Sequence, residues 1–100
     1  MILVAAAVPV DASKHELIVE ATNTMRNATL AEDGCVEYRF SFAIDNPNVV
    51  LIFEEWRDQD ALTAHFAAPH MAVFQSALGQ LVTAAPVVTR YEASSKGPLR

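Results

Sequence analysis

The sequence is poor in cysteine, glycine and basic residues, and each shortage argues against a class of protein. Its single cysteine, Cys35, cannot form an intramolecular disulfide and has no Cys or His close by in the sequence with which to hold a metal ion. Three glycines provide no Gly-rich loop of the kind that cradles nucleotide phosphates. The net charge of -5, from 7 basic and 12 acidic residues, argues against nucleic acid and against an anionic membrane as partners.

The sequence also lacks an apolar run long enough to cross a bilayer, which takes roughly 20 residues. The apolar segment at 1–10 is broken by Pro9 and lacks the basic residues that begin a signal peptide. We expect this segment to form a strand over 2–8 that is covered on both sides, because both of its faces are apolar. Together with the unpaired thiol, these features favour a cytoplasmic location.

Apolar residues make up 52% of the chain and charged residues only 19%, which is below the usual quarter. A chain of 100 residues has the size of one domain, which we place at 1–92, with 93–100 as a C-terminal tail. Such a small domain leaves apolar residues exposed on its surface, where a partner subunit could bury them. The composition therefore favours an oligomer over a monomer.

A helix is predicted over about 14–31. Ser13 and Glu16 have the spacing of a capping box at its start, and Gly34 follows as a terminator. The residues expected on its buried face, at helical spacing, are Leu17, Ala21, Met25 and Ala28.

After Gly34 the apolar period changes to two, which is typical of strands. The turn residues at 45–48 separate a strand that starts at 35 from a second strand over 49–56, so these two form a hairpin. The apolar face of the first strand is predicted to carry Val36, Tyr38, Phe40 and Phe42.

A short helix follows, capped by Asp58 or Asp60. Pro69 interrupts it, a third helix begins near His70, and a last strand covers 87–92. The inward faces are predicted to carry Leu62, His65 and Phe66 on the short helix, and Met71, Phe74, Leu78, Leu81 and Val82 on the third.

The order of elements is β-α-β-β-α-β. It predicts an α+β fold of the ferredoxin-like type, with the helices on one face of a four-stranded antiparallel sheet. The other face of the sheet would remain apolar in part. Two subunits that pair sheet to sheet would cover it.

Segment 53–74 contains the only Trp and two of the three His, residue types that hold aromatic ligands and move protons. His65 is predicted to point inward, where a neutral imidazole could take a proton from a phenol or enol. A core histidine bonded to a backbone carbonyl fits the same pattern. His70 stands at a helix start, where the dipole favours the neutral ring of a base, although a surface turn residue fits too. These two are the candidate catalytic residues.

Four further residues are candidates for substrate binding near the histidines. Trp56 and Glu54 leave their strand on the same face, so they could line one pocket. A carboxylate on an apolar face needs a partner such as His or Arg. Tyr38 and Phe74 could extend the aromatic wall, and both also fit an ordinary core.

Arg90, on the last strand, is a further binding candidate that could stabilise an anionic intermediate, or could pair across strands with Glu37 or Glu55. No metal site is predicted. His65 and His70 are five residues apart across a proline rather than at the i, i+4 spacing of helical zinc ligands, and the sequence shows no third ligand.

With these elements and candidate residues, the chain resembles the antibiotic biosynthesis monooxygenase superfamily, which includes quinol monooxygenases. The resemblance rests on EDGCVEYRF at 32–40, the NP turn at 46–47, EEWRDQDALTAHFAAPHMAVF at 54–74 and the lengths between them. It implies a homodimer built as a dimeric α/β barrel, with a pocket between sheet and helices in each subunit. The residues at matching positions in that pocket are Trp56, His65 and His70.

The resemblance also implies a reaction that needs no metal or flavin cofactor. A base deprotonates a phenol or quinol, and the electron-rich anion reduces dioxygen directly. We therefore expect a cofactor-independent monooxygenase whose partners are dioxygen and a small aromatic substrate.

Two alternatives remain open from the sequence. The first is an isomerase of a small carbonyl substrate, such as a phosphorylated dicarbonyl, that uses the same base without dioxygen. Only Arg57 is basic between residues 51 and 82, which weakens phosphate recognition. The second is a dimeric module that binds a hydrophobic metabolite without catalysis.

Overall fold

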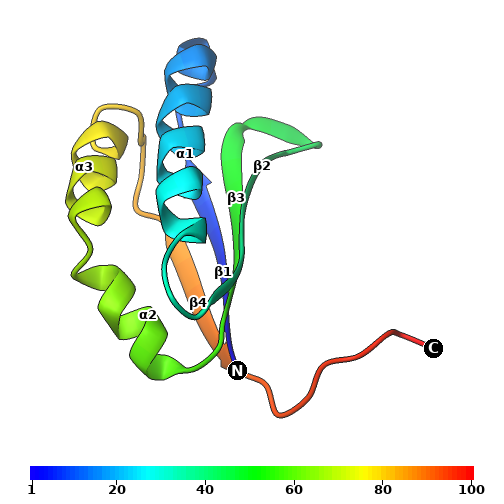
Figure 1. The fold of residues 1–100 in the computed structure, drawn as a ribbon. Helices are drawn as coiled ribbons and strands as arrows, with labels where there is room; N and C mark the ends of the chain where they lie inside the picture. Colours follow the sequence, from blue (N-terminus) through cyan, green and yellow to red (C-terminus); the bar gives the residue numbers. More distant parts are fainter.

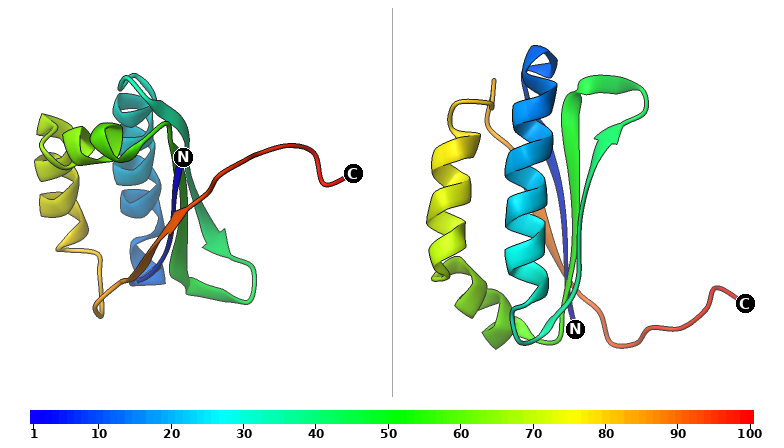
Figure 2. Two further views of the ribbon diagram at one scale, coloured as in Figure 1. Left: turned by 90° about the horizontal axis from the view of Figure 1, so that it is seen from below. Right: turned by 45° about the horizontal axis from the view of Figure 1, so that its top comes forward.

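A computed structural model describes residues 1–100 and confirms the α+β, ferredoxin-like fold (Figure 1). Four antiparallel strands form one sheet in the order β2-β3-β1-β4. The strands are β1 (Ile2–Pro9), β2 (Cys35–Ala43), β3 (Asn46–Trp56) and β4 (Val87–Glu92). The helices, α1 (His15–Leu30), α2 (Gln59–Phe66) and α3 (Pro69–Leu78), all lie on one face of the sheet, as both views of Figure 2 show.

The core lies between the helices and the sheet. β1 is a central strand that pairs with both β3 and β4, and it buries Ile2, Val4 and Val8 beneath the helices. Its alternate side chains, such as Ala5, lie on the open face. Within one chain the strand is therefore covered on one side only, which corrects the expectation of cover on both.

The start of α1 differs from the prediction, because no capping box forms. Asp11 accepts hydrogen bonds from the backbone N–H of Ser13 (3.0 Å) and from its hydroxyl (2.7 Å). The Ser13 side chain is thus already engaged. The bonds close a 3₁₀ turn over Ala12–Lys14, and α1 then begins at His15 without a side-chain cap.

The buried face of α1 lies one residue along from the predicted one. Of the four residues expected inside, Met25 is buried and Leu17 is exposed. The predicted and the observed sets of residues both have helical spacing. The predicted set is the more apolar, but the structure buries the other one. Thr22 tolerates burial because its hydroxyl donates to the carbonyl of Ile18 at 2.8 Å. The buried residues of α1 are Ile18, Thr22, Met25 and Thr29.

A bulge at the start of β2 moves one predicted core residue to the surface. The pairing register with β3 shifts between Cys35 and Glu37, which turns Val36 outward, whereas Tyr38 is buried as predicted. At the far end of the hairpin, β3 begins at Asn46, within the stretch predicted as a turn. The β2-β3 hairpin therefore extends past the C-terminal end of β1, as Figure 1 shows.

The two short helices follow the prediction with two differences. Asp58 is the residue that caps α2, since its carboxylate accepts from the N–H of Ala61 at 2.9 Å. Phe66, predicted to point inward, is exposed. It is the last residue of α2, whose buried face carries Leu62 and His65. α3 ends earlier than predicted, at Leu78, although Leu81 and Val82 beyond it are still buried or half-buried.

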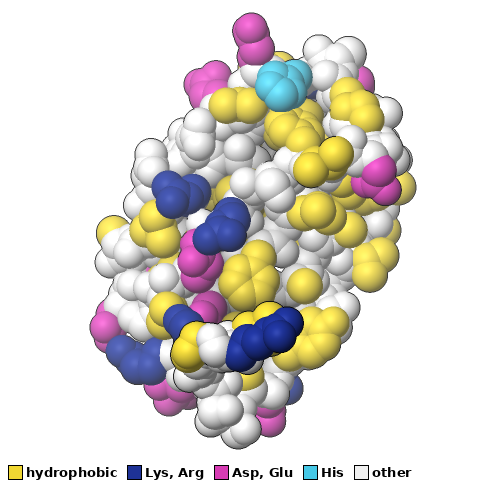
Figure 3. Space-filling view, turned by 90° about the vertical axis from the view of Figure 1, so that its right-hand side faces the viewer, with side chains coloured by type: hydrophobic (Ala, Val, Ile, Leu, Met, Phe, Trp, Pro, Cys, Tyr) yellow, Lys and Arg dark blue, Asp and Glu magenta, His cyan; other side chains and the backbone are white.

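The face of the sheet opposite the helices is open and largely apolar. Figure 3 looks onto this side of the molecule and shows apolar side chains gathered on it. Lys96 of the tail pairs there with Glu55 of β3 at 3.2 Å. No helix has the length and apolar character needed to cross a membrane. The apolar residues of the open face include Leu3, Ala5, Leu51, Phe53, Val87 and Tyr91.

Candidate functional site

Three side chains from separate elements meet at one end of the helical layer. Glu32 follows the end of α1, His65 lies on α2, and His70 lies in the first turn of α3. Oε2 of Glu32 is 2.7 Å from Nδ1 of His65 and 2.7 Å from Nε2 of His70. We call these three residues the His-Glu-His cluster.

The shared carboxylate oxygen determines where the ring protons lie. A carboxylate only accepts, so Nδ1 of His65 and Nε2 of His70 both carry a proton and donate to Glu32. In a neutral ring this leaves Nε2 of His65 and Nδ1 of His70 as lone-pair nitrogens. The cluster therefore fixes one tautomer for each histidine.

The two histidines differ in access. The His65 side chain is 1% exposed, and its Nε2 has no hydrogen-bond partner. The His70 side chain is 22% exposed. Only His70 can meet a dissolved molecule without rearrangement of the core, so it is the better candidate for a base that touches substrate.

Aromatic rings enclose His65. Its ring centroid lies 4.7 Å from that of Trp56 and 5.4 Å from that of Tyr38, and all three residues are buried. Trp56 Nε1–H donates to Glu54 at 2.9 Å, so Glu54 finds its partner in Trp56 rather than in His or Arg. The structure thus brings these four predicted residues together, as a sealed cluster and not as the wall of an open pocket.

Burial governs the acids in this sealed cluster. It raises the pKa of Glu54, and the hydrogen bond from Trp56 opposes that rise. Burial likewise raises the pKa of the Tyr38 hydroxyl. Cys35 is half-buried, and burial raises the pKa of its thiol to about 11. Since the thiolate is the reactive form, this rise in pKa disfavours Cys35 as a nucleophile.

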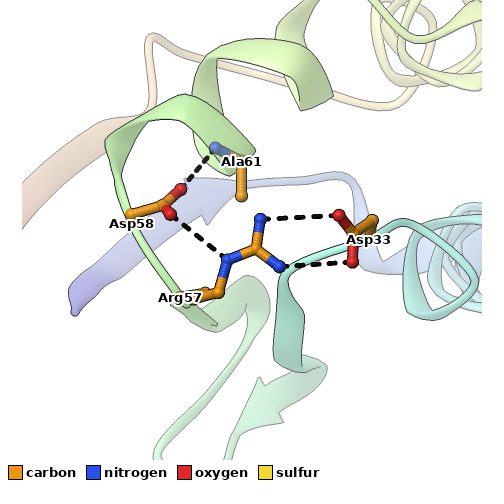
Figure 4. Close-up of polar contacts among 4 residues, drawn as sticks. All are labelled: Asp33, Arg57, Asp58 and Ala61. Atoms are coloured by element: carbon orange, nitrogen blue, oxygen red, sulfur yellow. Dashed lines mark hydrogen bonds and ion pairs between the residues drawn. The ribbon is translucent and has the colours of Figure 1, made fainter.

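An ionic clamp holds the Glu32 loop against α2 (Figure 4). Arg57 donates from Nη1 to Asp33 at 3.2 Å and from Nε to Asp58 at 3.2 Å. Asp58 in turn accepts from Ala61 N–H, and these bonds hold its pKa below the usual range. The loop that carries Glu32 is therefore tied to the start of α2, the helix that carries His65 in its last turn.

Gly34 allows the loop to come this close. Its φ of 86° lies in the left-handed region, and its carbonyl accepts from the N–H of Arg57 at 2.8 Å. A Cβ at this position would stand 2.6 Å from Cβ of Ala61 on α2. Any larger residue would push the loop and α2 apart.

A groove of about 630 Å³ runs between α1 and α3, and His70 lines it. Of the other predicted site residues, only Phe74 belongs to its lining. The walls are mainly apolar and contain no Lys or Arg, although they include Glu20. The groove therefore suits an uncharged, largely apolar molecule that comes within reach of His70.

Arg90 lies outside the groove. It donates to Gln59 at 3.3 Å and to Glu92 at 3.2 Å. The expected cross-strand pair with Glu37 or Glu55 does not form, because the register places both glutamates on the opposite face of the sheet.

Glu32 is the residue that sequence reasoning missed. It belongs to the EDGCVEYRF stretch, but nothing in its spacing relates it to histidines 33 and 38 residues away. The available signal was two acidic residues, Glu32 and Asp33, between the predicted helix end and Gly34.

Comparison with known proteins identifies the family to which the chain belongs. The family model for antibiotic biosynthesis monooxygenase matches residues 1–77. The chain belongs to the antibiotic biosynthesis monooxygenase family. The residues that suggested this resemblance thus led to the correct family.

Two proteins are similar to this chain in sequence. One is the uncharacterised protein sll1783 of Synechocystis, 33% identical over 73% of this chain and 50% of its own length. The other, Rv0793 of Mycobacterium tuberculosis, is named as a candidate monooxygenase and is 36% identical over 67% of this chain and 65% of its own. The chain thus matches less than two thirds of the length of either relative.

Solved structures of the family agree over the full chain. A candidate antibiotic biosynthesis monooxygenase from Deinococcus radiodurans superposes with a TM-score of 0.90 and 28% identity, covering 100% of this chain and 99% of its own. The structure of Rv0793 superposes with a TM-score of 0.86 and 25% identity, covering 97% and 98%. These similarities support a monooxygenase-like family and leave its substrate unspecified.

Proposed function

We propose that this protein is a cofactor-independent monooxygenase that oxidises a small phenol or quinol with dioxygen, with His70 as the base. The observation that carries the proposal is the contact of 2.7 Å between Nε2 of His70 and the Glu32 carboxylate beside the groove. Glu32 holds the Nε2 proton of His70, and His70 lines an apolar groove, so Nδ1 is the nitrogen that can accept a phenolic proton.

The His-Glu-His cluster also stabilises the protonated base. When His70 takes a proton, Glu32 lies 2.7 Å from the new imidazolium and offsets its charge. His65 reaches the same carboxylate from its buried side, so we assign it a positioning role. Trp56, Tyr38 and Glu54 support His65 from within the core rather than contacting the substrate.

The proposed reaction balances without an external reductant. The phenolate anion transfers electrons to dioxygen, a carbon–oxygen bond forms at a ring carbon, and the oxygen–oxygen bond then breaks. One oxygen atom remains on the ring as a quinone carbonyl, and the other leaves as water with the hydrogens that the substrate loses. All electrons that reduce dioxygen come from the substrate.

The lining of the groove favours this reaction over isomerisation of a phosphorylated dicarbonyl. A phosphate group would require cationic or N–H donors, and no Lys or Arg lines the groove. Its volume of about 630 Å³ lies within the range of small-molecule sites. An aromatic ring can pack against Met25, Val73 and Phe74.

We further propose that the protein acts as a homodimer in the cytoplasm. The open face of the sheet exposes Leu51 and Phe53 on β3 and Tyr91 on β4, and a second copy of that face would cover them. The one cysteine is unpaired, which suits a reducing compartment.

Oxygen uptake with a panel of phenols and hydroquinones tests the proposal. We expect His70→Ala to lower kcat by about 10²–10⁴-fold, as loss of a general base does. The control is His15→Ala, which removes the histidine on α1 that stacks on Phe42 away from the groove. No uptake by the wild type on any phenol would refute a monooxygenase. Turnover of a dicarbonyl without oxygen would show an isomerase, and a ligand that only raises the Tm would show a binding module.

A further inference from the structure

We propose that Glu32, His65 and His70 also form a binding site for a divalent transition metal ion, such as Zn²⁺ or Co²⁺. One ligand atom from each of these residues lies within 4.8 Å of the other two. Oε2 of Glu32 is 2.7 Å from both Nδ1 of His65 and Nε2 of His70. Two imidazole nitrogens and a carboxylate are a donor set that such ions prefer. No other group of His, Cys, Asp and Glu in the chain meets at this distance.

The break at Pro69 makes this geometry possible. In one continuous helix, residues five apart point in different directions, and for that reason the spacing alone predicted no metal site. In the structure His65 lies in the last turn of α2 and His70 in the first turn of α3, so both rings turn toward Glu32 with centroids 6.1 Å apart. Glu32 supplies the third ligand that the sequence did not reveal.

The ion would take the place of the two shared protons. Metal–ligand bonds of about 2.0–2.1 Å set neighbouring ligands roughly 3.0–3.4 Å apart, wider than the two contacts of 2.7 Å seen here. The two contacts with Oε2 must therefore lengthen by about half an ångström, while the three ligand atoms, which all lie within 4.8 Å of one another, settle at this common spacing. Glu32 and His70 can provide this movement because their side chains are 15% and 22% exposed, whereas buried His65 anchors the site.

Three protein ligands leave one coordination position open, which is the pattern of sites that accept water or a small ligand. His70 lines the groove between α1 and α3, so the ion would lie next to that groove. The ionic clamp of Asp33 and Arg57 holds the Glu32 loop in place and so preorganises the ligands.

Metal binding and the proposed base exclude each other. An ion on Nε2 of His70 forces the ring proton of the neutral imidazole onto Nδ1, which then has no lone pair for a phenolic proton. This one step rests on the proposed function, whereas metal binding itself does not. The consequence is that Zn²⁺ should inhibit the oxidation.

Titration of chelator-treated, dialysed protein with Co²⁺ tests the site, followed by its visible d–d absorption and by calorimetry. We expect one ion per chain, with Glu32→Gln and His70→Ala each weakening the affinity on the order of 100-fold or more. His15→Ala is the matched control, since it removes one histidine outside the cluster and should leave the affinity unchanged. Zn²⁺ should also raise the Tm of the wild type but not of His70→Ala.

Co²⁺ affinity that is equal in wild type and in both cluster variants would overturn the site, whether or not the protein consumes oxygen. A cobalt spectrum that depends on Glu32 and His70 would support the site even if no phenol were oxidised. If oxygen uptake is found, loss of uptake on adding Zn²⁺ supports mutual exclusion. Uptake that persists or rises with the ion bound refutes it.

Discussion

Replacing Gly34 by alanine should destabilise the protein, and the structure supplies the magnitude. The φ of 86° at Gly34 is left-handed, which costs a residue with a side chain about 1–2 kcal/mol. The new methyl group would stand 2.6 Å from Cβ of Ala61, and overpacking of this kind costs about 1–3 kcal/mol. The free energy of unfolding should therefore fall by about 2–5 kcal/mol, a large part of the 5–15 kcal/mol usual for a domain.

Calorimetry measures this change directly. In a domain of this size each kcal/mol shifts the Tm by roughly 4–8 °C, so the Tm of Gly34→Ala should fall by at least about 8 °C. Gly97→Ala is the control, because a Cβ at Gly97 meets no atom within 4 Å. Gly34→Asn separates the two costs, since Asn tolerates the left-handed region but still carries a Cβ. A Tm for Gly34→Ala within about 2 °C of wild type would refute the close approach of the loop to α2.

Three further predictions concern the buried acid, the open face and the thiol. Burial raises the pKa of Glu54 above 4.5 in the folded protein. The protonated carboxyl group therefore contributes its full stability below pH 4.5, and this contribution is lost as the pH rises through the folded-state pKa. Glu54→Gln should accordingly be more stable than wild type at pH 7 and equal to it in acid, and lower stability at pH 7 in denaturant titrations would contradict this. Phe53→Asp should convert the proposed dimer to monomers in native mass spectrometry. Phe66→Asp, on the exposed side of α2, is the control and should leave the dimer intact. A dimer that persists in Phe53→Asp would exclude the open face as the interface. Cys35, whose thiol has a pKa of about 11, should react with iodoacetamide much more slowly at pH 8 than free cysteine does, and equal rates would show that burial does not protect it.

The fold could be predicted because its signals are local and repeated. Two-residue alternation from Tyr38 to Phe42 and the broken helical pattern around Pro69 each identify an element without knowledge of its neighbours. The errors arose where two local solutions compete. Ser13 could cap a helix or bond to Asp11, and the bulge that turns Val36 outward leaves no mark in the alternation.

The site was harder to predict because it depends on contacts between distant segments. Helix phase correctly turned His65 inward, and strand phase correctly placed Glu54 and Trp56 on one face. Phase alone does not say how deep a side chain lies, so a sealed cluster was expected to be a pocket wall. Glu32 could not be assigned at all, since its partners are determined by how the hairpin brings the end of α1 to α2.

The position of Glu32 in the chain also makes the site a late product of folding. Its carboxylate lies 33 residues before His65, and the whole β2-β3 hairpin lies between them. The two histidines, five residues apart, can come near each other in a short fragment, but neither receives its carboxylate partner until the hairpin has closed and paired. A partly folded chain therefore carries both imidazoles without a fixed tautomer. Each histidine gains its contact with Glu32 only once the β2-β3 hairpin has formed.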